Sequence, residues 1–226
     1  MRGRKAEFER KLAQTGLWQL LDLLQTLPDE TARLARLCYA ASPASDWLDT
    51  PPEVFFSCAA HARYLRENVS WTRALPEPLF LAYVLHPRVN NEALCDYRPV
   101  FYAALAERLR GLPEEAAILE INRWCAEHVA YQPTDERTRS ALAVLRAGFG
   151  RCGEESMFAV NVLRACGFAA RQVYVPRWAH CDDNHAWVEA LCDGEWRFLG
   201  ACEPEPILDR GIQRELTPAR SFMASS

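Results

Sequence analysis

Cys152, His185 and Glu203 are the side chains of this sequence whose types and spacing best suit nucleophilic chemistry. Cys152 lies in GRCGEES (residues 150–156), where a glycine-bounded turn precedes an amphipathic pattern typical of a helix. A thiol at a helix N-terminus meets the positive end of the helix dipole and nearby amide N–H groups, which favour the reactive thiolate. His185 follows in DNHAWVE and Glu203 in ACEP. The sequence thus supplies a nucleophile, a base and an orienting carboxylate, in that order.

These residue types support one class of reaction, acyl transfer at an amide. A cysteine thiolate attacks the carbonyl carbon, an imidazole takes the thiol proton and returns one to the leaving amine, and a third group holds the imidazole in the required tautomer. The backbone amide of Cys152 can help to bind the developing oxyanion. This chemistry requires neither a metal ion nor an organic cofactor, and we expect none.

The second half of the chain predicts helices followed by an antiparallel sheet. Gly167 suits the C-terminal stop of the helix that begins at Cys152, and Asp193-Gly194 is a strong signal for a two-residue hairpin turn. Helices are expected at residues 138–146 and 152–166, and strands at residues 170–175, 185–192 and 195–201.

The expected hairpin also predicts which residues face one another. If Asp193 and Gly194 form the whole turn, residues 192 and 195 pair, and His185 lies opposite Cys202. Glu203 then lies on the other face of the sheet unless a bulge or a one-residue change in the loop intervenes. The expected register therefore brings Glu203 to His185 only through such a shift.

The first half of the chain predicts helices and contains no motif with a chemical interpretation. Pro43, Pro51 and Pro52 indicate a loop, and the prolines of residues 68–91 indicate turns around one short helix. Helices are expected at residues 6–27, 30–41, 53–66, 98–109 and 113–128. We therefore expect an α+β fold, with a helical N-terminal region (residues 1–112) preceding a catalytic core (residues 113–226).

The motifs around Cys152 and His185 resemble those of the transglutaminase-like superfamily, whose members share a papain-like core. The nucleophile of that family matches Cys152 in a Gly-x-Cys-Gly-Glu helix start, and its histidine matches His185 in HAWVE on a strand. The segments WAHCDDN (178–184) and GACEPEP (200–206) resemble a bacterial subgroup. The resemblance covers roughly residues 113–206.

The resemblance has one departure, which concerns the third residue. The family has an Asp-Pro shortly after a tryptophan in the last strand, whereas Trp196 is followed here by RFLG, and Glu203-Pro204 is the nearest equivalent. The match places Glu203 in the orienting role. It implies thiol-dependent acyl chemistry on peptide or protein amides, with peptide hydrolysis, transfer to an amine or deamidation as the outcome. The alternative is a catalytically inactive member that binds peptides or proteins.

The composition narrows the partners and the compartment. The net charge is −4 and the basic residues are scattered, which argues against nucleic-acid binding. No uninterrupted apolar stretch predicts a signal peptide or a membrane span. Nine cysteines, an odd number, fit reduced thiols in the cytoplasm better than a secreted disulfide framework. The sequence leaves the oligomeric state open.

Other residues near the motifs have weaker functional interpretations. Trp178 can form a wall of a substrate groove, and Asp183 competes with Glu203 as a partner of the imidazole. A zinc site built from nearby histidine and cysteine residues is disfavoured because no Cys-x-x-Cys pair is present. The residues of that alternative are His180, Cys181, Cys192 and Cys202.

Overall fold

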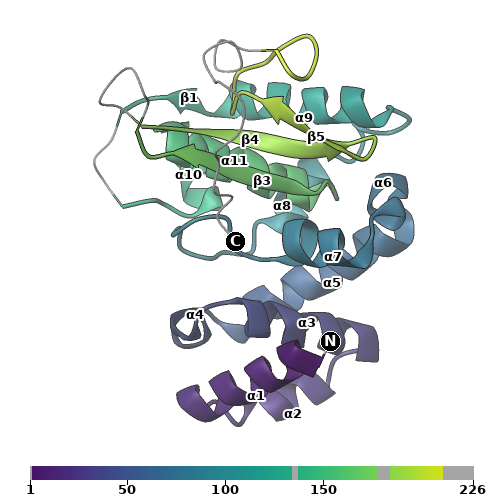
Figure 1. Cartoon of the computed structure of the whole chain (residues 1–226), viewed down its shortest axis with the longest axis vertical. Coiled ribbons are helices and arrows are strands. Elements are labelled where there is room, and N and C mark those ends of the chain that lie inside the picture. The colour runs from purple at the N-terminus through teal and green to yellow at the C-terminus, as the bar shows by residue number, and fades with distance from the viewer. Residues whose placement is uncertain (1, 134–136, 178–183, 211–226) are drawn as a thin grey trace.

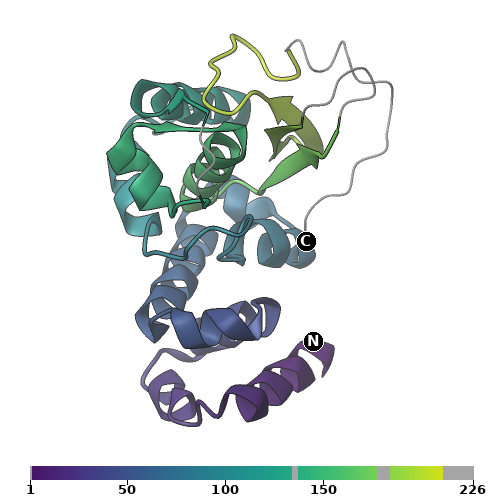
Figure 2. The same ribbon diagram turned by 90° about the vertical axis from the view of Figure 1, so that its left-hand side faces the viewer.

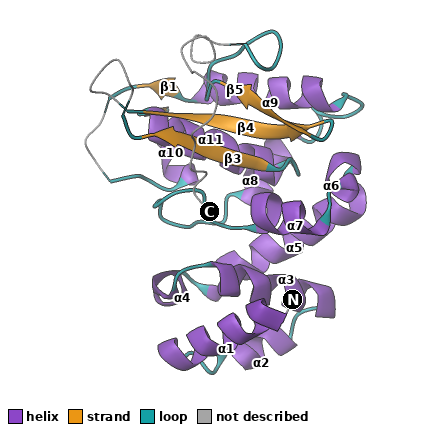
Figure 3. Cartoon of the chain, in the orientation of Figure 1, coloured by secondary structure: helices purple, strands orange, loops and turns teal. Residues whose placement is uncertain are grey.

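The computed structural model describes residues 2–133, 137–177 and 184–210. Helices form most of the described chain, and one three-stranded antiparallel sheet lies among them (Figures 1 and 3). The fold is α+β, as the sequence predicts. Among the described helices, none has the length and apolar character that a membrane crossing requires.

The N-terminal helices form the lower part of the molecule in Figures 1 and 2. They are α1 (Arg2–Thr15), α2 (Leu20–Gln25), α3 (Asp29–Ala41), α4 (Ala44–Asp49) and α5 (Pro52–Asn68). Their buried faces share an aromatic cluster, in which the Tyr39 ring stacks on Phe55 at 4.1 Å between centroids and meets Trp47 edge-on at 4.8 Å. The hydrophobic cluster of these helices also includes Phe80, Val84, Leu85 and Ala169 from later in the chain, so it continues into the rest of the molecule.

The N-terminal helices differ from the prediction at two places. The expected helix at residues 6–27 is two helices, because Gly16 adopts φ +71°, which ends α1. The expected loop after residue 43 contains α4, since Pro43 and Pro51 flank this helix rather than interrupt it. Trp47, which is 3% exposed, fixes α4 to the cluster.

The segment after α5 contains more helix than the single short element expected there. It forms α6 (Ser70–Ala74), α7 (Glu77–Phe80) and the π-helical turn η1 (Leu81–Leu85). Pro78 lies in the first turn of α7, where a helix does not need the missing N–H. The prolines therefore divide this segment into short helices and do not abolish them.

The second half of the molecule is built around one central helix, α11 (Cys152–Ala165). One side of α11 packs against the sheet, and other sides pack against the helices drawn around it in Figure 2. Residues 154–165 of α11 are all buried, which is typical of a helix inside a core. The surrounding elements are α8 (Arg98–Leu105), α9 (Glu114–His128), α10 (Ala141–Ala147), β3 (Ala170–Val175), β4 (His185–Cys192) and β5 (Glu195–Leu199).

The sheet confirms the predicted hairpin. Cys192 pairs with Glu195 across the two-residue turn, whose residues Asp193 and Gly194 have φ of +50° and +82°. β3 and β4 have the predicted bounds, whereas β5 ends at Leu199 instead of residue 201. Pairing between β4 and β5 accordingly stops at Val188 and Leu199.

The C-terminal end of α11 is completed by side chains from α5 and α6. Helix ends leave carbonyl groups without intrahelical partners. Here His61 Nε2 lies 2.8 Å from Ala165 O, and the Trp71 indole donates to Cys166 O at 3.0 Å. Thr72 Oγ1 donates to the next carbonyl, that of residue 167, at 2.8 Å. The helix that begins at Cys152 is therefore fastened at its far end by residues 61–72.

The division of the chain at residues 112 and 113 stays a prediction. α8, which precedes that position, packs against α11, and the Phe101 and Phe158 rings meet edge-on at 5.4 Å between centroids.

Candidate active site

A buried ion pair fixes the turn that leads into Cys152. Two short parallel strands, β1 (Ala130–Tyr131) and β2 (Phe149–Gly150), pair just before α11. The Glu154 side chain is fully buried beneath this turn, 3.0 Å from the Arg139 guanidinium. A Cβ at Gly150 would lie 2.8 Å from Glu154 Cβ, so the turn requires glycine there. The start of α11 is thus held in one position.

The Cys152 thiol lies against the beginning of β4. Cys152 is the first residue of α11 and is half-buried. The backbone amide N–H groups of Gly153 and Ala186 lie close enough to its sulfur to lower the pKa of the thiol. Ala186 directly follows His185, so the structure brings the helix start and the histidine-bearing strand end together. Within the described residues, β5 pairs with β4 only as far as Val188, so the first residues of β4, which lie near the thiol, have no β5 partner.

The electrostatic setting of Cys152 differs from the sequence-based expectation. Burial raises the pKa of the Cys152 thiol, and the charge of Glu155 acts in the same direction. The two amide N–H groups and Arg151 lower this pKa, but they do not outweigh burial. The Arg151 guanidinium donates instead to Thr138 Oγ1 at 2.9 Å. Burial therefore outweighs the helix N-terminus, which we expected to favour the thiolate.

His185 is the first residue of β4 and pairs with Val175 of β3. The His185 side chain is half-buried, and its ring stacks with that of Trp187 at 6.3 Å between centroids and 26° between planes. Because side chains alternate along a strand, His185 and Trp187 share one face, and Ala186 lies on the face toward α11. The imidazole thus lies at the strand end whose next amide contacts the Cys152 sulfur.

Glu203 follows a turn that takes the chain out of the sheet. The register places position 202 opposite His185, as predicted, but pairing ends before it. Cys202 adopts φ +56°, and the Glu203 amide donates to Gly200 O at 3.3 Å. The Glu203 carboxylate folds back over Gly200, where a Cβ would lie 2.4 Å from its Oε2. Its charge acts on Glu155 of α11, and the orienting role of Glu203 toward His185 stays a prediction.

The comparisons with known proteins agree with the motifs in this region. Residues 103–201 match the model of the transglutaminase-like superfamily. The chain carries a transglutaminase-like domain. Among solved structures it is similar to the crystal structure of a "putative cysteine protease" from Cytophaga hutchinsonii, with 18% sequence identity and a TM-score of 0.44. That match covers 64% of this chain and 50% of the other, so the chain spans about half of that protein. No curated protein matches.

Glu155 is a residue of the transglutaminase-like domain that the sequence analysis did not single out. It is 6% exposed and lies three residues after Cys152, on the same side of the first helical turn. Burial and the nearby charge of Glu203 raise the pKa of Glu155 to about 8. The helical spacing from Cys152 was the available signal, but the burial and the second carboxylate depend on the tertiary structure.

Two buried amides hold the segments around the candidate site, and sequence reasoning missed both. Gln172 of β3 donates through Nε2 to Gly153 O at 2.9 Å and to Ser156 Oγ at 2.7 Å. Asn122 of α9 donates to the carbonyls of residues 200 and 203 at 2.9 Å each, and its Oδ1 accepts from the Cys202 amide. These amides fix the first turn of α11 and the turn that carries Glu203.

Of the other residues singled out by the sequence, some lie inside and some outside the described part of the chain. Trp178, His180, Cys181 and Asp183 lie outside it. Cys192 lies at the hairpin end of β4 near Glu114 and Asp193, where burial and these carboxylates raise its pKa to about 12. Cys202 contacts the first turn of α11 through Glu155 O, at the other end of β4. These two cysteines therefore do not share a zinc site.

Proposed function

We propose that this protein is a thiol-dependent acyl-transfer enzyme that acts on peptide or protein amides. Cys152 is the nucleophile, His185 the general acid and base, and Glu203 the residue that orients the imidazole. The observation that supports this proposal is the packing of α11 against β4, which brings the Ala186 amide near the Cys152 sulfur and so places the helix start beside the strand end that begins with His185. The transglutaminase-like domain supports the same class of chemistry.

The raised pKa of Cys152 makes a base necessary for attack. The Cys152 S–H proton passes to the His185 imidazole as the sulfur forms a bond to the amide carbon, and the carbonyl oxygen becomes an oxyanion. The imidazolium then gives that proton to the leaving nitrogen, the C–N bond breaks, and a thioester remains on Cys152. Water or an amine attacks the thioester and restores the thiol. Backbone N–H groups at the start of α11 are suited to the oxyanion.

The second nucleophile determines whether the product is a hydrolysed peptide, a deamidated glutamine or a new amide bond. The three outcomes share the thioester and differ only in the amide attacked and in whether water or an amine completes the reaction. Trp178 is our candidate for a residue that contacts the substrate. No metal ion or organic cofactor takes part in these steps.

The proposal is tested with a glutamine-containing peptide and a fluorescent primary amine. We expect ammonia release, or cleavage, together with a thioester mass adduct on the intact protein. Cys152→Ala should abolish both, a loss of about 10³-fold or more, because no other group supplies the covalent step. Cys95→Ala is the matched control, since Cys95 is a second partly exposed thiol. Full activity in Cys152→Ala, with Cys95→Ala equal to it, would contradict the proposal.

The second candidate is a non-catalytic member that binds peptides or proteins. The raised pKa of Cys152 and the action of the Glu203 charge on Glu155 favour it. Alkylation by iodoacetamide across pH separates the candidates. An enzyme should lose thiol reactivity in His185→Ala over the neutral range, where the imidazole is the proton acceptor. An unchanged alkylation profile in His185→Ala, with no turnover in the wild type, supports the binding module.

A further inference from the structure

A pocket of about 640 Å³ lies between the N-terminal helices and the sheet, apart from Cys152. Its walls come from α1, the end of α3, the segment after η1, the end of α11 and β3. Four arginines line it, and no aspartate or glutamate among the described residues does. They are Arg4, Arg88, Arg164 and Arg171. The volume falls in the range of small-molecule sites, and the lining indicates a positive potential.

Arg164 is the most unusual of the four, because it is buried without a carboxylate partner among the described residues. It is 4% exposed. Its Nε donates to Ala170 O at 3.1 Å, and its Nη1 donates to the carbonyls of His86 and Arg88 at 3.1 and 2.8 Å. Burial lowers the pKa of Arg164 to about 10, which shows that the guanidinium is poorly solvated. Its Nη2 makes no hydrogen bond within the described chain.

Arg4 is the second cation of the pocket without an ion pair in the described chain. It lies on α1 and is exposed. Together with burial, the charges of Arg164 and Arg4 lower the pKa of His86 to about 4, so both guanidinium groups lie near this neutral ring. Two positive charges therefore converge on the same wall.

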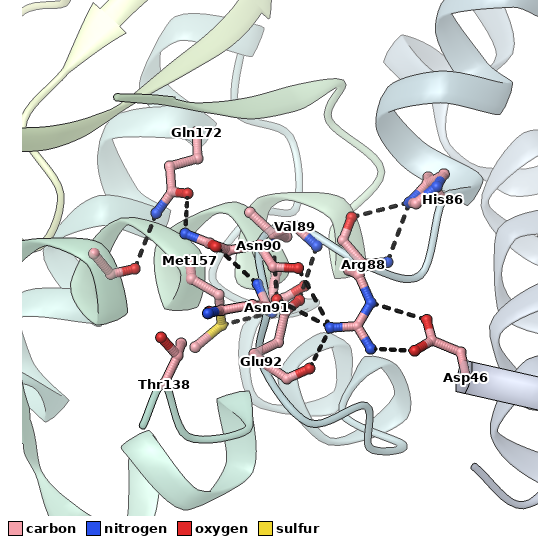
Figure 4. Close-up of polar contacts among 12 residues, drawn as sticks. Asp46, His86, Arg88, Val89, Asn90, Asn91, Glu92, Thr138, Met157 and Gln172 are labelled. Carbon is pink, nitrogen blue, oxygen red and sulfur yellow. Dashed lines mark hydrogen bonds and ion pairs between the residues drawn. The ribbon is translucent and has the colours of Figure 1, made fainter. Parts of the chain in front are cut away.

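The positive charges of Arg88 and Arg171 are already neutralised by carboxylates of the protein. Arg88 makes two hydrogen bonds to the Asp46 carboxylate, at 2.6 and 2.9 Å, as Figure 4 shows. Arg171 makes two to Glu189 Oε2, at 2.6 and 2.8 Å. These carboxylates neutralise the charges of Arg88 and Arg171. The excess positive charge of the pocket therefore comes from Arg4 and Arg164.

Hydrogen bonding to nearby backbone carbonyl groups does not by itself explain why Arg164 lies on the pocket wall. Arg98, which is 1% exposed and does not line the pocket, already donates through Nη2 to the carbonyls of Val84, Leu85 and His86. Arg164 combines similar carbonyl contacts with a position on the pocket wall. A buried guanidinium is stabilised when an anion takes the place of lost water. We propose that the pocket binds a small ligand bearing a phosphate or carboxylate group, whose oxygens pair with Arg4 and Arg164.

The proposed pocket is connected to the helix that carries Cys152. Asn90 lines the pocket and donates through Nδ2 to Gln172 Oε1 at 2.7 Å (Figure 4). Gln172 also lines the pocket, and its Nε2 holds Gly153 O. An occupant of the pocket thus contacts the amide that fixes the first turn of α11.

Isothermal titration calorimetry of the full chain tests the proposal, with inorganic phosphate and citrate as separate probes. It uses the Cys152→Ala protein, so that binding is measured without turnover, and low ionic strength, because salt screens charges. We expect saturable binding of at least one probe. Arg4→Glu should weaken it about tenfold or more, since attraction becomes repulsion.

Lys5→Glu is the matched control. It changes the net charge equally one residue away, outside the pocket lining, and its salt bridge to Glu9 is exposed at both ends. We expect its affinity to remain within about twofold of the parent protein, because Lys5 does not line the pocket and therefore does not pair with the ligand. Binding of phosphate alone identifies a phosphate ligand, and binding of citrate alone identifies a carboxylate ligand. Absence of saturable binding for both probes, or equal weakening by the two variants, would overturn the proposal.

Discussion

At the scale of single residues, the candidate site contains two acidic groups with raised pKa values, which its sequence motifs do not predict. Cys152 and Glu155 lie on one side of the first turn of α11, and burial raises the pKa of each. A neutral thiol beside a neutral carboxylic acid reduces the cost of desolvation at the buried end of this turn. In the mechanism proposed above, the thiol therefore needs a base, for which His185 is the candidate.

We predict that Glu155→Gln changes the pH dependence of stability. An unfolded glutamate has a pKa near 4.3, and burial raises that of Glu155 to about 8. Between these values the folded protein holds more protons than the unfolded chain, so the free energy of unfolding falls as pH rises. The loss is on the order of a few kcal/mol, at about 1.4 kcal/mol per pKa unit. Glu155→Gln should remove this slope in urea unfolding measured from pH 5 to 9; an unchanged slope contradicts the assignment.

The sequence predicted the segments of the site better than its supporting contacts. GRCGEES and HAWVE located Cys152 and His185 because a helix start and a strand end have local signatures. The turn after Leu199 was not foreseen, because it is held by Asn122, far away in the chain. Gln172 and Glu155 were missed for the same reason, since their partners are defined only by tertiary packing.

At the scale of elements, α11 is the central helix, against which α8, α9, α10 and the sheet pack. Cys152 is its first residue, and Gly167, two residues after its last, adopts φ +91°. Strand periodicity was sufficient to find β3 and β4 with their bounds, and the turn residues predicted the register of the hairpin. The helix α4 could not be predicted in this way, because its flanking prolines read as loop signals and its anchor, Trp47, is evident only from burial.

We predict that Gly167→Ala is much more destabilising than Gly111→Ala. Both glycines have φ between +70° and +95°, where alanine costs about 1 kcal/mol. At Gly167 a Cβ would also lie 2.1 Å from Thr72 Oγ1, whereas nothing lies within 4 Å at Gly111. The additional clash should bring the loss for Gly167→Ala to about 3 kcal/mol or more. Equal shifts of the two variants in chemical denaturation would show that Thr72 does not hold this helix end.

At the scale of the whole molecule, neutral histidines lie at the junction between the N-terminal helices and the rest. His61 reaches Ala165 O at the end of α11, and His86 lines the arginine pocket. Burial lowers the pKa of both to about 4. Protonation of either ring would place a charge inside this junction, next to Arg164 in the case of His86.

We predict that the free energy of unfolding decreases as pH falls from about 6.5 to 4. In that window the unfolded chain binds more protons than the folded one, because the pKa of each histidine is lower in the folded state. This slope is opposite in sign to that of Glu155, so it is best measured in the Glu155→Gln protein. Replacing His61 and His86 by glutamine in that background should reduce the dependence of the unfolding free energy on pH between about 6.5 and 4, measured by urea unfolding. An unchanged dependence on pH would contradict the assignment.

The side chains that complete the far end of α11 have a consequence for biosynthesis. Residues 61–72 leave the ribosome before α11 does, since synthesis runs from the N-terminus. When the helix that bears Cys152 is synthesised, the residues that bind its C-terminal carbonyl groups are therefore already present. During synthesis the end of α11 can therefore form its contacts with His61, Trp71 and Thr72 as soon as it is made.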